Sequence, residues 1–159
     1  MSGRREVARL KKSLDNVFTR APLSSAPMEV QSDFAKYLCV LVSGFLEKAV
    51  SALLEELAMR RSAPEVAAFV ASELRYWMNP TTGKISDLLG SFSNAWRVRA
   101  EEFLVDEKKE HINSLVALRN KIAHGESVGT SLSQVKEYYK TTVTVVEFLA
   151  DVIDPPQSP

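Results

Sequence analysis

Residues 28–61 read MEVQSDFAKYLCVLVSGFLEKAVSALLEELAMRR, and this stretch decides the fold. Between Phe34 and Leu57, apolar side chains occur on almost every side of a helical projection. A helix of that kind belongs in the middle of a bundle or in a subunit interface, because it has no face suited to water. The sequence therefore predicts one long central helix from about Met28 to Arg61.

A first helix is predicted before it, from about Arg4 to Arg20. Its apolar residues recur at helical spacing, and its other face is basic. The apolar set is Val7, Leu10, Leu14, Val17 and Phe18, and the basic set is Arg5, Arg9, Lys11 and Lys12. This amphipathic and charged segment contains no apolar core of the kind that a signal peptide needs.

The segments after residue 61 are also helical in pattern. Ser62 and Glu65 have the spacing of a capping box, which predicts a third helix to about Met78. Residues 84–104 continue the pattern, with a break expected near Gly90 and Ser91.

Two further helices complete the prediction. Asp106 is the expected cap of a helix that ends at Gly125, and Ser131 with Gln134 opens a last helix. We find no pattern of paired strands, so the expected fold class is all-α, a bundle of about five to six helices. Residues 1–154 are expected to form a single domain, followed by a disordered proline-rich tail over residues 155–159.

The composition limits the classes of function. The chain has 20 basic and 20 acidic residues and a net charge of zero, whereas a dedicated nucleic-acid coat protein shows a basic excess. Any contact with RNA must therefore come from a local patch.

The single cysteine and the apolar stretch around it suggest packing. Cys39 has no partner for an internal disulfide, and its apolar neighbours indicate a core position. The nearly uncharged stretch between Lys36 and Glu47 is too short to span a bilayer. We therefore expect a cytoplasmic protein without a membrane segment.

Only two histidines are available for chemistry. No set of histidines, cysteines or carboxylates has the spacing of a metal site, so neither a metal nor another cofactor is expected. His111 lies among charged residues and is expected to be a solvated surface residue. His124 lies in the last turn of a helix, immediately before Gly125, where an imidazole can meet a substrate and exchange protons near neutral pH.

Arg119 and Asn120 accompany His124 on this helix. At about 100° per residue, Asn120 and His124 lie about 100° and 140° from Arg119, so the three polar groups form one arc. The apolar residues of the helix lie within about 60° of Arg119, which places its guanidinium in the packed face. They are Ile112, Leu115, Val116, Ile122 and Ala123.

A partner for Arg119 is expected, because an unpaired charge in packed surroundings is costly. Glu47 lies in a similar setting on the central helix, between Val40, Gly44, Ser51 and Leu54. We expect a bidentate Glu47–Arg119 contact, within or across subunits. The alternative is that Arg119 extends along the helix to water.

The run Leu118–Gly125, LRNKIAHG, resembles the motif of the HEPN superfamily: an arginine, a polar residue after it, and a histidine four to six positions further. The segments YLCVLVSGFLE at residues 37–47 and ISDLLGSF at residues 85–92 are similar to the RiboL-PSP-type branch. The resemblance covers roughly residues 30 to 150. An arginine and a histidine at this spacing are weak by themselves, whereas the asparagine, the glycine and the long apolar helix make the resemblance specific.

The resemblance implies a homodimer in which two such helices form a composite cleft. Catalytic members cut RNA without metal, by attack of the ribose 2′-hydroxyl on the adjacent phosphate. His124 would then be the general acid or base, Arg119 would hold the phosphate oxygens, and Asn120 would orient His124 or bind phosphate. Lys121, Arg97 and Arg99 are expected to add phosphate contacts.

Two functions fit this resemblance. The first is an endoribonuclease of a toxin or defence system, with RNA as substrate and an antitoxin or other protein as a possible partner. The second is a non-catalytic dimer that binds RNA or a protein and keeps the motif for structure. The aromatic residues at helical spacing, Trp77, Trp96, Tyr138 and Phe148, are expected in the core rather than on a base-stacking surface.

Overall fold

The computed structural model describes residues 3–158, and within this range the chain forms seven α-helices and no strand. The helices are α1 Gly3–Phe18, α2 Met28–Arg61, α3 Pro64–Leu74, α4 Thr82–Phe92, α5 Asn94–Phe103, α6 Asp106–Ala123 and α7 Leu132–Ile153. The predicted all-α class is confirmed. Seven helices occur because the expected break in residues 84–104 separates two of them.

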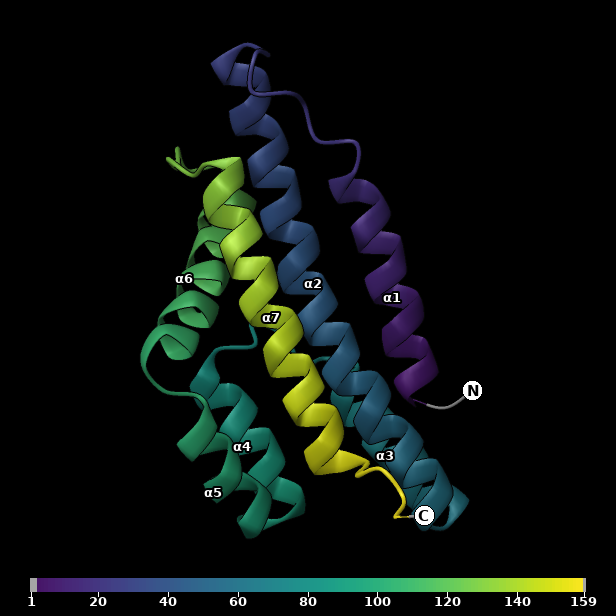
Figure 1. Ribbon diagram of the computed structural model, residues 1–159. Helices are drawn as coiled ribbons and strands as arrows, with labels where there is room; N and C mark the ends of the chain where they lie inside the picture. Colours follow the sequence, from purple (N-terminus) through teal and green to yellow (C-terminus); the bar gives the residue numbers. More distant parts are fainter. Residues whose placement is uncertain (1–2, 159) are drawn as a thin grey trace.

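Helix α2 is the centre of the bundle, as its sequence predicts. It packs against α1, α3, α6 and α7, and Figure 1 shows α1 on one side of it and α6 and α7 on the other. Leu38, Leu46 and Leu54 are fully buried in this packing. Cys39 is buried with them, as expected, and burial raises the pKa of its thiol to about 11.

The apolar part of α2 is longer than the stretch between Lys36 and Glu47. By length and composition alone the helix could cross a membrane, a test that the core helices of soluble proteins also pass. However, 56% of its most apolar window is buried inside the structure, against the neighbouring helices. This packing accounts for the apolar composition as that of a core helix.

Two of the predicted helix caps are wrong. Ser62 does not open α3: its hydroxyl donates to the Ala58 carbonyl at 2.6 Å and ends α2, while Ala63 precedes Pro64 without a side-chain cap. Asp106 also makes no cap; it has a φ of 54°, in the left-handed region, and Val105 holds the capping position. Helix α3 ends at Leu74 rather than near Met78.

Two other helix starts have serine caps. Ser93 has an extended backbone and accepts a hydrogen bond from the Trp96 amide at 3.4 Å, so the break falls there instead of at Gly90. Ser131 accepts from the Gln134 amide at 3.1 Å and opens α7, as predicted. The β-branched segment 141–146 lies inside this helix.

The four aromatic residues expected in the core are there. Tyr138 is buried, and Trp77, Trp96 and Phe148 are partly buried against the core cluster. The Phe103 and Phe148 rings stack with centroids 3.9 Å apart, which joins α5 to α7.

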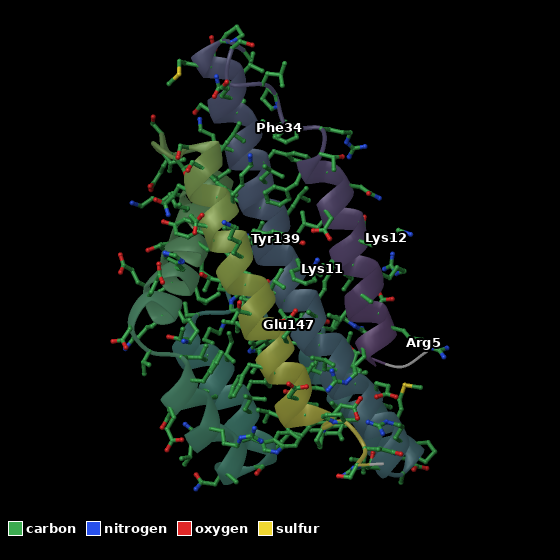
Figure 2. All side chains as sticks on the ribbon, viewed as in Figure 1. Arg5, Lys11, Lys12, Phe34, Tyr139 and Glu147 are labelled. Atoms are coloured by element: carbon green, nitrogen blue, oxygen red, sulfur yellow. The ribbon has the colours of Figure 1, made fainter. Side chains whose placement is uncertain are left out.

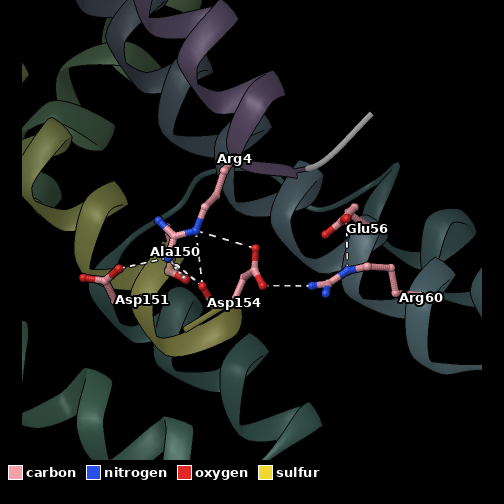
Figure 3. A network of polar contacts seen from close by, with 6 residues as sticks. All are labelled: Arg4, Glu56, Arg60, Ala150, Asp151 and Asp154. Carbon is pink, nitrogen blue, oxygen red and sulfur yellow. Dashed lines mark hydrogen bonds and ion pairs between the residues drawn. The ribbon is translucent and has the colours of Figure 1, made fainter. Parts of the chain in front are cut away.

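A polar network joins the ends of three helices (Figure 3). Arg4 at the start of α1 donates to the Ala150 and Asp154 carbonyls at the end of α7 and pairs with Asp151 at 2.9 Å. Asp154 also pairs with Arg60 of α2 at 3.0 Å. These contacts place a cation against the last carbonyls of α7, where the helix dipole favours it.

Candidate functional site

The end of α6 has the hydrogen bonds of a Schellman motif. The Glu126 amide donates to the Lys121 carbonyl at 2.9 Å, and the Gly125 amide donates to the Ile122 carbonyl at 3.1 Å. Gly125 has a φ of 73°, which a glycine adopts without strain. The helix therefore ends close to the predicted position, at Ala123, with the exposed His124 as its C-cap.

Asn120 connects the other two members of the motif, Arg119 and His124. It lies one turn before His124, and its carbonyl accepts the His124 amide at 3.1 Å. Its side-chain Oδ1 accepts a hydrogen bond from Nη1 of Arg119 at 3.3 Å. The His124 ring makes no hydrogen bond to any of residues 3–158, so it is open to an outside molecule.

Arg119 does not lie fully inside the packed face. Ile112, Leu115 and Val116 are buried as expected, but Ala123 is exposed and Arg119 is only half-buried. Its guanidinium lines a groove of about 430 Å³ between α1, α2 and α6. Ser13, Tyr37, Val40, Glu47 and Lys48 are among the other residues that line this groove.

The expected Glu47–Arg119 pair is not formed within the protomer. Both residues line the groove, but no ion pair or hydrogen bond joins them in the described chain. The groove explains this difference, because side chains that reach water need no partner to remain charged. The alternative expectation for Arg119, that it extends toward water, agrees better with this geometry.

The groove itself was missed by sequence reasoning. The α2 sequence predicts an apolar surface all round, whereas Tyr37 is 50% and Val40 is 38% exposed. Together with Gly44 and Lys48, these residues repeat every three to four positions and mark one accessible side of α2. Tyr37 and Lys48 could have indicated this accessible side from the sequence, because each brings a polar group into a stretch that is otherwise packed.

The three additional phosphate-binding candidates lie in different places. Lys121 is exposed near the end of α6, next to the motif. Arg97 pairs with Asp87 of α4 at 2.9 Å, and the Arg99 guanidinium lies 5.8 Å from the centre of the Phe148 ring. In Figure 1, α5 lies at one end of the bundle and the C-terminal end of α6, which carries the motif, lies toward the other end. One protomer therefore does not bring Arg97 and Arg99 to the motif.

His111 is not the solvated surface residue that its charged neighbours suggested. Its side chain is 14% exposed, and its Nδ1 lies 2.7 Å from the Thr141 hydroxyl of α7. The Tyr138 ring meets it edge-on at 5.2 Å. The prediction was wrong because His111 faces the polar Thr141 across the α6–α7 interface, a contact that local charge pattern does not reveal.

No group of three histidine, cysteine or acidic side chains arranged to hold a metal ion occurs in residues 3–158. The chemistry available at the end of α6 is therefore that of an imidazole, a guanidinium and an amide. An imidazole can accept or donate a proton, and a guanidinium can hold phosphate oxygens in a bidentate contact.

Comparisons with known proteins identify the family of the chain. Searches of curated proteins and of solved structures each gave no match. The model of the RiboL-PSP-HEPN family matches residues 4–155, which include the motif at the end of α6 and, apart from Gly3, all seven helices. The chain therefore belongs to the RiboL-PSP-HEPN family of the HEPN superfamily.

Proposed function

We propose that the protein is a metal-independent endoribonuclease of HEPN type. Family membership suggests a ribonuclease or RNA-binding role. The observation that carries the catalytic proposal is the exposed His124 at the end of α6, with Arg119 and Asn120 joined by a hydrogen bond one turn before it. An acid–base group, a cation and an amide at one helix end are what a phosphodiester reaction without metal requires.

The proposed reaction is an internal transesterification. The ribose 2′-oxygen forms a bond to the adjacent phosphorus, and the bond from phosphorus to the 5′-oxygen of the next nucleotide breaks. One histidine accepts the proton of the 2′-hydroxyl, and a second group gives a proton to the leaving 5′-oxygen. Arg119 binds the non-bridging oxygens, where negative charge grows in the transition state. The products are a 2′,3′-cyclic phosphate and a 5′-hydroxyl.

The reaction needs one group that accepts a proton and another that donates one. A homodimer supplies both as two copies of His124. The exposed side of α6 supports this arrangement, because Ala117, Lys121 and His124 lie within about 60° of one another on it, and Ala117 is small enough for a second helix to approach closely. Light scattering at micromolar concentration tests the dimer. A stable monomer would contradict both the dimer and the composite site.

The biological setting is proposed on the same basis. The superfamily often occurs in toxin and defence systems, so we propose a cytoplasmic toxin or defence component, with a neutralising protein as its partner.

The test of the function is incubation of the purified protein with mixed RNA, with and without EDTA, followed by analysis of the new ends. We expect cleavage in EDTA and cyclic phosphate ends. RNA that stays intact while it binds to the protein would favour the non-catalytic alternative.

A further inference from the structure

The zero net charge conceals an uneven distribution of charge along the chain. Residues 4–20 contain six basic and two acidic residues, whereas the rest of the chain contains 14 basic and 18 acidic residues. Helix α1 and the turn after it are therefore positive on a chain that is otherwise negative. Figure 2 shows Arg5 and Lys12 projecting from α1 on the side turned away from α2.

The apolar side of α1 is already used. Leu14 is 5% exposed, and Val7, Leu10, Val17 and Phe18 pack against the core. A helix that binds at a membrane surface needs its apolar side free to enter the lipid. With its apolar side in the core, α1 can meet a polyanion only through its cations, and this favours a nucleic-acid backbone over a lipid surface.

The groove extends from α1 to the motif helix α6. Ser13 of α1 and Arg119 of α6 both line it. Arg9 lies about one turn before Ser13, and Lys48 lines the groove from α2. Arg9 is 60% exposed and pairs with Glu6 at 2.6 Å, but an exposed ion pair is weak enough for a phosphate to compete with it.

Tyr37 gives the groove a surface for a base. Its ring is 50% exposed, and it meets the Phe34 ring edge-on at 5.8 Å. Phe34 packs against the core, so the contact holds the Tyr37 ring while half of it stays open. Exposed aromatic rings held in this way are the usual stacking partners of unpaired bases.

We propose that the groove between α1 and α2 binds the single-stranded RNA that adjoins the scissile phosphate. Tyr37 stacks on a base, and Arg9 and Lys48 contact the backbone. Glu47 also lines the groove, and its carboxylate keeps the phosphates toward the α1 side. This inference rests on the proposed function for the identity of the ligand, but it is tested by binding and not by cleavage.

The test uses the full chain with His124→Ala, so that RNA is not cut, and a fluorescently labelled single-stranded RNA in an anisotropy titration. Tyr37→Ser should weaken binding about fivefold to 100-fold, the usual effect of losing one stacking partner, whereas Tyr37→Phe should bind like the parent. Tyr76→Ser is the matched control, since Tyr76 is 71% exposed outside the groove. It should leave the affinity unchanged.

The backbone contacts are tested by salt dependence. In the double variant Arg9→Gln with Lys48→Gln, the slope of log Kd against log salt should fall by about 1.4, since each phosphate contact on a single strand contributes about 0.7. Arg61→Gln with Lys109→Gln removes two exposed cations elsewhere and should keep the slope. Circular dichroism and light scattering of every variant verify that fold and assembly are unchanged.

Several outcomes would overturn the inference. The first is equal RNA affinity in the Tyr37 and Tyr76 variants, and the second is a salt slope that both double variants change alike. The third is a Tyr37 variant that alters the oligomeric state instead of RNA affinity. If the full chain binds phosphatidylserine vesicles and does not bind RNA, the ligand of the basic α1 helix is a membrane surface instead. A protein that binds RNA in this groove but never cuts it would refute the proposed nuclease and leave this inference intact.

Discussion

The hydroxyl of Tyr139 on α7 donates a hydrogen bond to the carboxylate of Asp15 on α1 at 2.5 Å, and Lys11 pairs with the same carboxylate at 2.9 Å. The Tyr139 ring also stacks on Phe18, with centroids 4.6 Å apart. Figure 2 shows Tyr139 and Lys11 in the space between α7 and α1. This contact fixes α1 on the bundle and therefore fixes one wall of the groove.

The Asp15–Tyr139 contact should make stability depend on acid pH. Burial acts to raise the Asp15 pKa, but the hydrogen bonds from Tyr139 and Lys11 outweigh it, so the pKa is lowered on folding. The stabilisation is thus present above the unfolded-state pKa and is lost as pH falls through the folded-state pKa. Since the carboxylate is 44% exposed, Asp15→Asn should cost only about 1 kcal/mol at neutral pH.

Urea unfolding at neutral pH and at about pH 3 checks this prediction. The wild type should lose more stability on acidification than Asp15→Asn does. Tyr139→Phe should also be destabilised at neutral pH, with the difference from wild type reduced in acid. Parallel pH curves for the wild type and Asp15→Asn would contradict the contact.

His111 should contribute to stability and not to catalysis. His111→Ala removes the contact with the Thr141 hydroxyl and the edge-on contact with Tyr138, and should lower the free energy of unfolding by about 1–3 kcal/mol. Below its melting temperature, the variant should still cut RNA. Thermal unfolding and an RNA assay on the same sample separate the two effects. An inactive but fully stable His111→Ala would reverse this assignment.

Gly125 should be required for the backbone conformation that ends α6. With φ at 73° and no atom within 4 Å of an added Cβ, Gly125→Ala would be strained by its backbone and not by a clash. The expected loss is about 1 kcal/mol, and Gly125→Asn should lose less because asparagine tolerates this conformation. Thermal unfolding measures both, and equal stability of the alanine variant and wild type would show that this glycine is not needed.

Much of the architecture could be predicted because it depends on local pattern. The bounds of α2 follow from continuous apolar composition, and the end of α6 follows from a glycine after the last helical residue. What could not be predicted depends on contacts between distant segments. His111 is mostly buried, against Thr141 30 positions later, and Glu47 and Arg119 stay apart because a groove brings water to both.

Glu47 and Arg119 should act independently in the isolated protomer. Since no contact joins them, the effects of Glu47→Ala and Arg119→Ala on unfolding should add within about 0.5 kcal/mol. The measurement is a double-mutant cycle by urea unfolding, at concentrations below and above any dimerisation. A coupling that emerges only at high concentration would show that the pair forms across subunits.

The decisive prediction concerns His124. His124→Ala should reduce RNA cleavage at least about 100-fold, the usual contribution of a positioned acid–base group. Fold and assembly should remain intact, because the ring is exposed and makes no hydrogen bond to residues 3–158. A gel assay with RNA and with a substrate that carries 2′-deoxyribose at the cut measures this, and the deoxy substrate should resist the wild type. Cleavage that persists in the His124 variant, or that EDTA abolishes in the wild type, would assign the activity to a contaminant or another mechanism.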